Sequence, residues 1–122
     1  MRRWIALVEG LAQPKSIPFA GEVFHCSNER FDHFRINPDR GVYFANEPDS
    51  AYGRYTYRCH IILDNAALYG SLDNMEIDRH ELIEQGFDGR IVDYAEESDA
   101  PMYDYIAFYD HQIKIIEIIE NK

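Results

Sequence analysis

The sequence predicts an α+β domain with a mixed or antiparallel split β-sheet and a few short helices. The 122 residues are enough for one domain, residues 1–122, around one hydrophobic core. Hydrophobic residues make up 46% of the chain and charged residues 28%, which is typical of globular proteins. Short runs of Tyr, Ile, Val and Phe alternate with turn residues, so strands should be many and helices few.

Three short strands are expected in the first 45 residues, because each apolar run ends at a turn residue or a polar side chain. Gln13–Pro18 is expected to be a loop, since its two prolines each remove a backbone donor and fix φ. The three strands are Trp4–Glu9, Gly21–Cys26 and Val42–Ala45.

The segment between the second and third of these strands is expected to hold a helical turn and a tight turn. Asn28 is a candidate N-cap for Glu29–Phe34, which would place Phe31 and Phe34 on one side of the helical turn. Asn37–Gly41 is a turn by composition.

Two further helices are expected. The first begins at Glu47–Ser50 and continues over Ala51–Arg54, with a proline and acidic residues in its first turn. The second spans Arg79–Gln85, with Asp78 as N-cap and Gly86 as the residue that ends it.

The remaining strands are expected in the second half of the chain. The longest candidate is rich in Tyr, Thr and Ile, which favour extended backbone. The expected strands are Tyr55–Asp64, Tyr103–Phe108 and Ile113–Ile119, and Phe87–Val92 is expected to be a turn followed by a strand. Tyr109–Gln112 is expected to be a tight turn and Glu96–Pro101 an acidic, solvated loop.

The charge of the chain excludes broad classes of partner. A net charge of −10 disfavours general DNA or RNA binding, because nucleic-acid binders gather Lys and Arg on one face. The same charge favours a protein partner with a basic surface. No signal peptide or membrane span is visible, so we expect no membrane association and a cytoplasmic location.

The metal-ligating residue types show no metal pattern. Cys26 and Cys59 are isolated and are expected to be buried, reduced thiols. The histidines share no metal spacing with one another or with the cysteines, so no metal site is expected. The histidines outside the motifs below are His33, His60, His80 and His111.

An ordered set of short motifs runs from about Phe24 to Ile116. The motifs are His25-Cys26-Ser27, Gly41-Val42-Tyr43-Phe44-Ala45, Gln85-Gly86-Phe87-Asp88-Gly89, Asp104-Tyr105-Ile106-Ala107-Phe108 and Gln112-Ile113-Lys114. This order resembles small bacterial and phage ADP-ribosyltransferases of the His-Tyr-Glu (diphtheria toxin/PARP-like) group. In that family the motifs read His-Gly-Ser/Thr, Gly-x-Tyr-Phe-Thr, Gly-Tyr-Asp-Gly, Glu-Tyr-x-x-Phe and Gln-Ile-Lys.

The resemblance implies that NAD is the substrate and that flat rings hold its nicotinamide. Cleavage of the nicotinamide–ribose bond passes through an oxocarbenium-like state, which a nearby carboxylate stabilises. Tyr43 and Tyr55 would sandwich the ring, with Tyr52 as a substitute for Tyr55 and Phe44 placed among the NAD-binding residues.

The resemblance also implies a role for the first motif. His25 would hydrogen-bond the adenosine ribose of NAD. Cys26 stands where the family has Gly, and puts a side chain where NAD approaches the backbone. Ser27 keeps the hydroxyl of the family motif, and is equally interpretable as a turn residue.

Asp104 occupies the place of the family's catalytic Glu. Its side chain is one methylene shorter, so its carboxylate would lie about 1 Å or more from the family position, a shift that can cost on the order of 10²-fold in rate. Three interpretations stay open: an active enzyme with an adjusted backbone, a Glu from Glu96-Glu97 in its place, or a site without turnover.

The function implied by the resemblance is mono-ADP-ribosyl transfer from NAD to a protein, as a toxin, a phage or bacterial effector, or an inhibitor of a host defence system. Two alternatives use the same fold. One is a catalytically silent domain that blocks a protein partner, and the other is an NAD glycohydrolase with water as acceptor.

Overall fold

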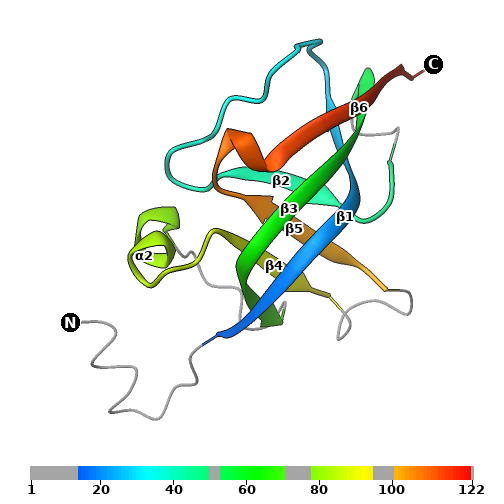
Figure 1. Cartoon of the computed structure of the whole chain (residues 1–122). Coiled ribbons are helices and arrows are strands. Elements are labelled where there is room, and N and C mark those ends of the chain that lie inside the picture. The colour runs from blue at the N-terminus through cyan, green and yellow to red at the C-terminus, as the bar shows by residue number, and fades with distance from the viewer. Residues whose placement is uncertain (1–13, 50–52, 71–77, 95–100, 122) are drawn as a thin grey trace.

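A mixed β-sheet with little helix dominates the computed structural model, which describes residues 14–49, 53–70, 78–94 and 101–121 (Figure 1). This architecture agrees with the mixed sheet and few helices expected from the sequence, but the described strands form one continuous sheet and not the expected split sheet. None of the described helices has the length and apolar character needed to cross a membrane. The elements are β1 (Lys15–Ser27), β2 (Val42–Ala45), β3 (Tyr55–Gly70), α2 (Arg79–Glu84), β4 (Gly89–Asp93), β5 (Tyr103–Ala107), the 3₁₀ helix η3 (Asp110–Gln112) and β6 (Ile113–Glu120).

The strand pairings close into a ring. The order is β1-β2-β5-β4-β3-β6, and β1 pairs with β3 as well as with β2. All described pairings are antiparallel except β3–β4, which is parallel. The 16-residue β3 makes this closure possible, because β1 follows one of its edges while β6 and β4 share the other (Figure 1).

Both faces of the central strands β4 and β5 are buried, against two separate apolar clusters. Successive residues of a strand point to opposite faces, so Ile91 and Tyr105 enter one cluster while Val92 and Ile106 enter the other. The inner cluster lies within the ring and the outer cluster lies under α2. The inner cluster comprises Val23, Val42, Phe44, Tyr57, Cys59, Ile61, Leu63, Ala66, Ile91, Tyr105 and Ala107; the outer comprises Ala67, Leu82, Phe87, Val92, Ile106 and Phe108.

The predicted loop at Gln13–Pro18 is wrong over Lys15–Pro18, which form the start of β1. The pairing of β1 with β3 shifts register between Ile17 and Phe19. Pro18 sits at this irregularity, where the ladder is already interrupted and a missing N–H leaves no partner unpaired.

The helical turn predicted after β1 is also wrong, because other groups hold its backbone. The Tyr57 hydroxyl donates to the carbonyl of Glu29 and accepts from the N–H of Phe31, each at 2.8 Å. The side-chain oxygen of Asn28 accepts from the N–H of Arg54 at 3.2 Å instead of capping a helix. Tertiary hydrogen bonds therefore outcompete the local helical ones.

The helix predicted from Glu47 does not form over residues 47–49, 53 and 54, and residues 50–52 lie outside the described residues. The N–H of Arg54 donates to the side chain of Asn28, and a Cβ on Gly53 would lie 2.8 Å from the backbone of Ser27, so this segment is held closely against the end of β1. The predicted strand Trp4–Glu9 and most of the acidic run Glu96–Pro101 also lie outside the described residues.

Several local predictions are confirmed. Asp78 caps α2 by accepting from the N–H of His80, and Gly86 follows the helix with φ +95°. Asn37 opens the predicted turn by accepting from two backbone N–H groups, and Gly41 closes it with φ +87°. The remaining predicted strands form, with β3 extending six residues beyond the predicted end at Asp64.

Candidate functional site

Three neighbouring strands bring the candidate residues Tyr43 and Asp104 to one face of the sheet. Tyr43 of β2 and Arg90 of β4 both pair with Ile106 of β5, so the three form one row. Asp104 lies two positions from Ile106 and pairs with Val92. Because paired residues and residues two apart point the same way, Tyr43, Arg90 and Asp104 share this face.

Two side-chain hydrogen bonds organise the face. The Nη2 of Arg90 donates to the hydroxyl of Tyr43 at 2.9 Å, and the guanidinium carbon lies 6.0 Å from the centroid of the Tyr43 ring. The hydroxyl of Tyr94 donates to Oδ2 of Asp104 at 2.8 Å. We refer to Tyr43, Arg90, Tyr94 and Asp104 as the β2–β5–β4 cluster.

The cluster has a buried base and an exposed edge. Arg90 is only 6% exposed, whereas Tyr43 is 37% exposed. Burial raises the pKa of Tyr94 to about 12, with further contributions from its hydrogen bond to Asp104 and the charge of that carboxylate. Tyr94 is therefore a neutral hydrogen-bond donor to Asp104 at neutral pH.

His25 lies on the inner side of β2, among aromatic rings. Its ring meets four others edge-on at centroid distances of 5.1–6.4 Å. Its Nδ1 lies 2.7 Å from the backbone carbonyl of Tyr43, so the N–H is on Nδ1 and donates to that carbonyl. Burial lowers the pKa of His25, with the bond to Tyr43 opposing it. The four rings are those of Phe31, Phe34, Phe44 and Tyr57.

The imidazole of His25 and the phenol of Tyr43 thus lie on opposite sides of β2. The imidazole packs with Phe44, which is 2% exposed and belongs to the inner cluster. Tyr43 precedes Phe44 on the strand and points to the other face. The two residues are connected by the hydrogen bond from His25 Nδ1 to the backbone carbonyl of Tyr43, and their side chains do not line a common surface.

Cys26 and Ser27 make local contacts at the end of β1. The thiol of Cys26 donates to the carbonyl of Asp49 at 3.1 Å, and is 3.7 Å from the hydroxyl of Thr56. The hydroxyl of Ser27 accepts from the N–H of Glu29 at 3.1 Å, as in a turn. Both side chains are half-buried.

The second aromatic wall of the expected NAD site is not assembled beside Tyr43 by the described residues. Tyr55 is half-buried against the inner cluster, and the guanidinium of Arg54 lies 5.6 Å from its ring centroid. Among the described ring pairs, none joins Tyr55 to Tyr43. Tyr52, its substitute, lies outside the described residues.

Two members of the cluster, Arg90 and Tyr94, were not predicted from the sequence. The signal that could have found Arg90 is its place beside the apolar residues Ile91 and Val92 of a predicted strand, because charged residues are rarely buried unless they are paired. Tyr94 follows β4 and carries no local signal. Its importance depends on the pairing of β4 with β5.

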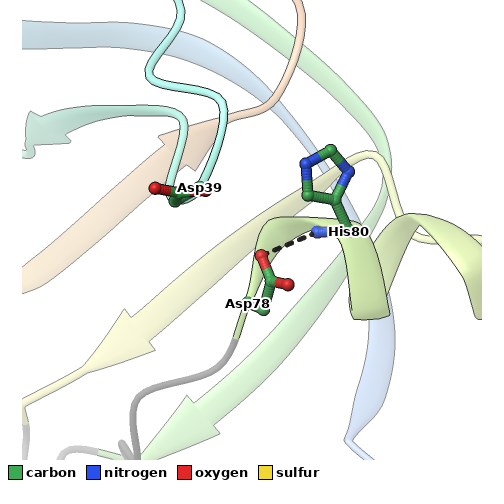
Figure 2. Close-up of side chains that lie close together, drawn as sticks. All are labelled: Asp39, Asp78 and His80. Carbon is green, nitrogen blue, oxygen red and sulfur yellow. Dashed lines mark hydrogen bonds between the residues drawn. The ribbon is translucent and has the colours of Figure 1, made fainter.

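A second group of ionisable side chains gathers at the start of α2 (Figure 2). One possible ligand atom from each of Asp39, Asp78 and His80 lies within 4.8 Å of the other two, and all three residues are exposed. Two hydrogen bonds explain this convergence: the N–H of His80 donates to the side chain of Asp78, and the N–H of Arg79 donates to the carbonyl of Asp39. The spacing of residues in the sequence did not predict this group, because Asp39 is far from α2 in the chain.

Comparison with protein-family models, with curated proteins and with solved structures finds no match to this chain.

Proposed function

We propose that this domain is a mono-ADP-ribosyltransferase that takes ADP-ribose from NAD and transfers it to a protein. The observation that supports this most directly is the convergence of Tyr43 and Asp104 on one face of three paired strands. These two residues come from motifs about 60 positions apart, and the resemblance assigned both to the same reaction.

The reaction breaks the bond between C1′ of the ribose and the nicotinamide nitrogen, and the bonding electron pair leaves with nicotinamide. A nucleophile on the target protein then forms a bond to C1′ and loses its proton. Asp104 stabilises the positive charge that develops on the ribose ring. The exposed ring of Tyr43 stacks on nicotinamide.

The other residues of the region position these two. Tyr94 holds the carboxylate of Asp104 through its hydroxyl, and its high pKa keeps that proton in place. His25 fixes the backbone of β2 through the carbonyl of Tyr43, a positioning role that differs from the direct ribose contact implied by the resemblance. The net charge of −10 favours a target with a basic surface.

The test is incubation of the purified protein with labelled NAD and cell lysate. We expect labelled protein and released nicotinamide. Asp104→Ala and Tyr43→Ala should each lower the rate on the order of 10²-fold or more. Asp110→Ala is a matched control, because Asp110 is exposed outside the cluster. Absence of both label and nicotinamide would contradict the proposal.

A catalytically silent, partner-blocking domain is the second candidate. The hydrogen bond from the Tyr94 hydroxyl to Asp104 favours this candidate, because it occupies one carboxylate oxygen of Asp104. The side chain of Asp104 is also one methylene shorter than the Glu of the family that the sequence resembles. In that case the wild type releases no nicotinamide, and Asp104→Ala retains the cellular function. Nicotinamide release without labelled protein would instead identify an NAD glycohydrolase.

A further inference from the structure

Arg90 is buried without a charged partner among the described residues. Its side chain lies at the base of the β2–β5–β4 cluster and is 6% exposed. Its Nη2 has a neutral partner, the hydroxyl of Tyr43, and its buried Nε has no hydrogen-bond partner in the part of the chain that the structure describes. The ion pairs between described residues are made by Arg30, Arg54 and Arg58. A buried cation in this state is costly, because a hydrogen bond to a neutral hydroxyl offsets only part of the hydration it lost.

Phenols lie near the guanidinium, and one of them, Tyr69, is also within the field of the Glu81 carboxylate. Burial raises the pKa values of Tyr69 and Tyr94, and the positive charge of Arg90 opposes both shifts, which places the two phenols within its field. The nearby carboxylate of Asp104 accepts a hydrogen bond from Tyr94. The cluster therefore presents a cation whose buried Nε–H donor is not used by any of the described groups.

We propose that Arg90 binds a phosphate oxygen of the ligand, and that Tyr43 covers the guanidinium until the ligand arrives. A guanidinium is a planar fork of five donors that matches the oxygens of a phosphate. A phosphate oxygen would replace the neutral phenol on Nη2 and supply the missing partner of Nε. Tyr43 is the exposed member of the cluster, so movement of its ring opens the route to Arg90.

The spacing to Asp104 connects this site with NAD, an assignment that rests on the proposed function. Arg90 and Asp104 are diagonal neighbours on paired strands, roughly 7–8 Å apart at their Cα atoms. In NAD a single ribose separates the pyrophosphate from the bond to nicotinamide. Arg90 therefore holds the phosphate next to that ribose while Asp104 faces C1′.

The test is titration of the full chain with inorganic pyrophosphate, followed by NMR of the arginine Nε–H groups in ¹⁵N-labelled protein. The resonance that disappears in Arg90→Lys identifies Arg90. We expect this resonance to shift saturably and the melting temperature to rise. Arg58→Met is the matched control, since Arg58 pairs with Glu22 and Glu117 outside the cluster and should leave both effects intact.

Two further variants keep the proposal falsifiable. Arg90→Met should abolish the thermal stabilisation by pyrophosphate. Tyr43→Phe removes the hydroxyl that competes for Nη2, and should tighten pyrophosphate binding several-fold. No shift of the Arg90 resonance, or equal stabilisation of wild type and Arg90→Met, would overturn the proposal.

The experiments distinguish a failure of the phosphate site at Arg90 from a failure of the proposed transferase function. Pyrophosphate binding at Arg90 without NAD cleavage would retain the phosphate site and reject the transferase. With an active enzyme, Arg90→Met should raise KM for NAD on the order of 10-fold or more, with a smaller change in kcat. NAD turnover with unchanged KM in Arg90→Met would reject the phosphate site alone.

Discussion

His25 illustrates how the surroundings of one residue set its chemistry. Its ring lies among four aromatic side chains, and burial lowers its pKa below the ordinary value of 6.5. The bond from its Nδ1 to the carbonyl of Tyr43 opposes this shift without reversing it. The neutral imidazole is therefore the form that the folded protein favours.

The stability of the protein should depend on pH through His25. Below about pH 6.5 the unfolded chain binds a proton at this residue while the folded chain does not, so the free energy of unfolding falls as pH falls. The loss is present between pH 6.5 and the lower pKa of the folded state, with a slope of at most about 1.4 kcal/mol per pH unit. Urea unfolding at several pH values measures it.

The control for this prediction uses two variants. His25→Gln should lose this component of the pH dependence, whereas His33→Gln, at an exposed position, should retain it. The same pH slope in wild type and His25→Gln would contradict the assignment.

At the scale of elements, two glycines with positive φ end a turn and a helix, and they differ in their surroundings. Gly41 has φ +87°, and a Cβ there would lie 2.5 Å from the carbonyl oxygen of Ala107 and 3.0 Å from Cγ2 of Ile106. Gly86 has φ +95°, and a Cβ there would meet no atom of the described residues within 4 Å. Substitution of these two glycines therefore distinguishes the cost of backbone strain, present at both, from the cost of steric overlap, expected at Gly41.

Gly41→Ala should destabilise the protein by about 2–4 kcal/mol, because the new methyl group forces β2 away from β5 in addition to straining φ. Gly86→Ala should cost only about 1–2 kcal/mol, the strain of the left-handed conformation alone. Denaturant unfolding of both variants measures the difference. Equal losses would show that the contact with β5 is relieved at no cost.

Closure of the strand ring is the feature of the whole molecule that governs its core and its candidate site. β3 is long enough to pair with β1, β4 and β6, and the return from β1 to β2 completes the ring. The chain of 122 residues has a net charge of −10. In the folded state its acidic side chains are held close together, so they repel one another at low salt.

The melting temperature should rise by a few degrees as NaCl increases from about 0.01 to about 0.15 M, because salt screens this repulsion. Thermal unfolding followed by circular dichroism measures the change. The triple variant Glu47→Gln, Asp64→Asn and Glu84→Gln changes exposed residues and carries −10 plus three, or −7, so its salt dependence should be smaller. A melting temperature that falls with salt would show that surface ion pairs such as Arg58–Glu22 dominate.

The sequence predicted those features whose causes are local. The N-cap Asp78, the turn opened by Asn37 and the strand Val42–Ala45 each depend on neighbours within a few residues. The helices predicted after Asn28 and at Glu47 do not form in the described residues. Their backbone N–H groups donate to side chains from distant elements, and the second segment lies close to the end of β1.

For the candidate site, the sequence by itself determined the residue types and their order: His25, Tyr43 and Asp104 in motifs that resemble one enzyme family. Tertiary structure decided their neighbours. Strand pairing placed Tyr43 and Asp104 with Arg90 and Tyr94 on one face, and turned His25 toward the inner cluster. The physical reason is that the side on which a strand residue points, and the residue it meets, depend on the register of pairing with strands far away in the chain.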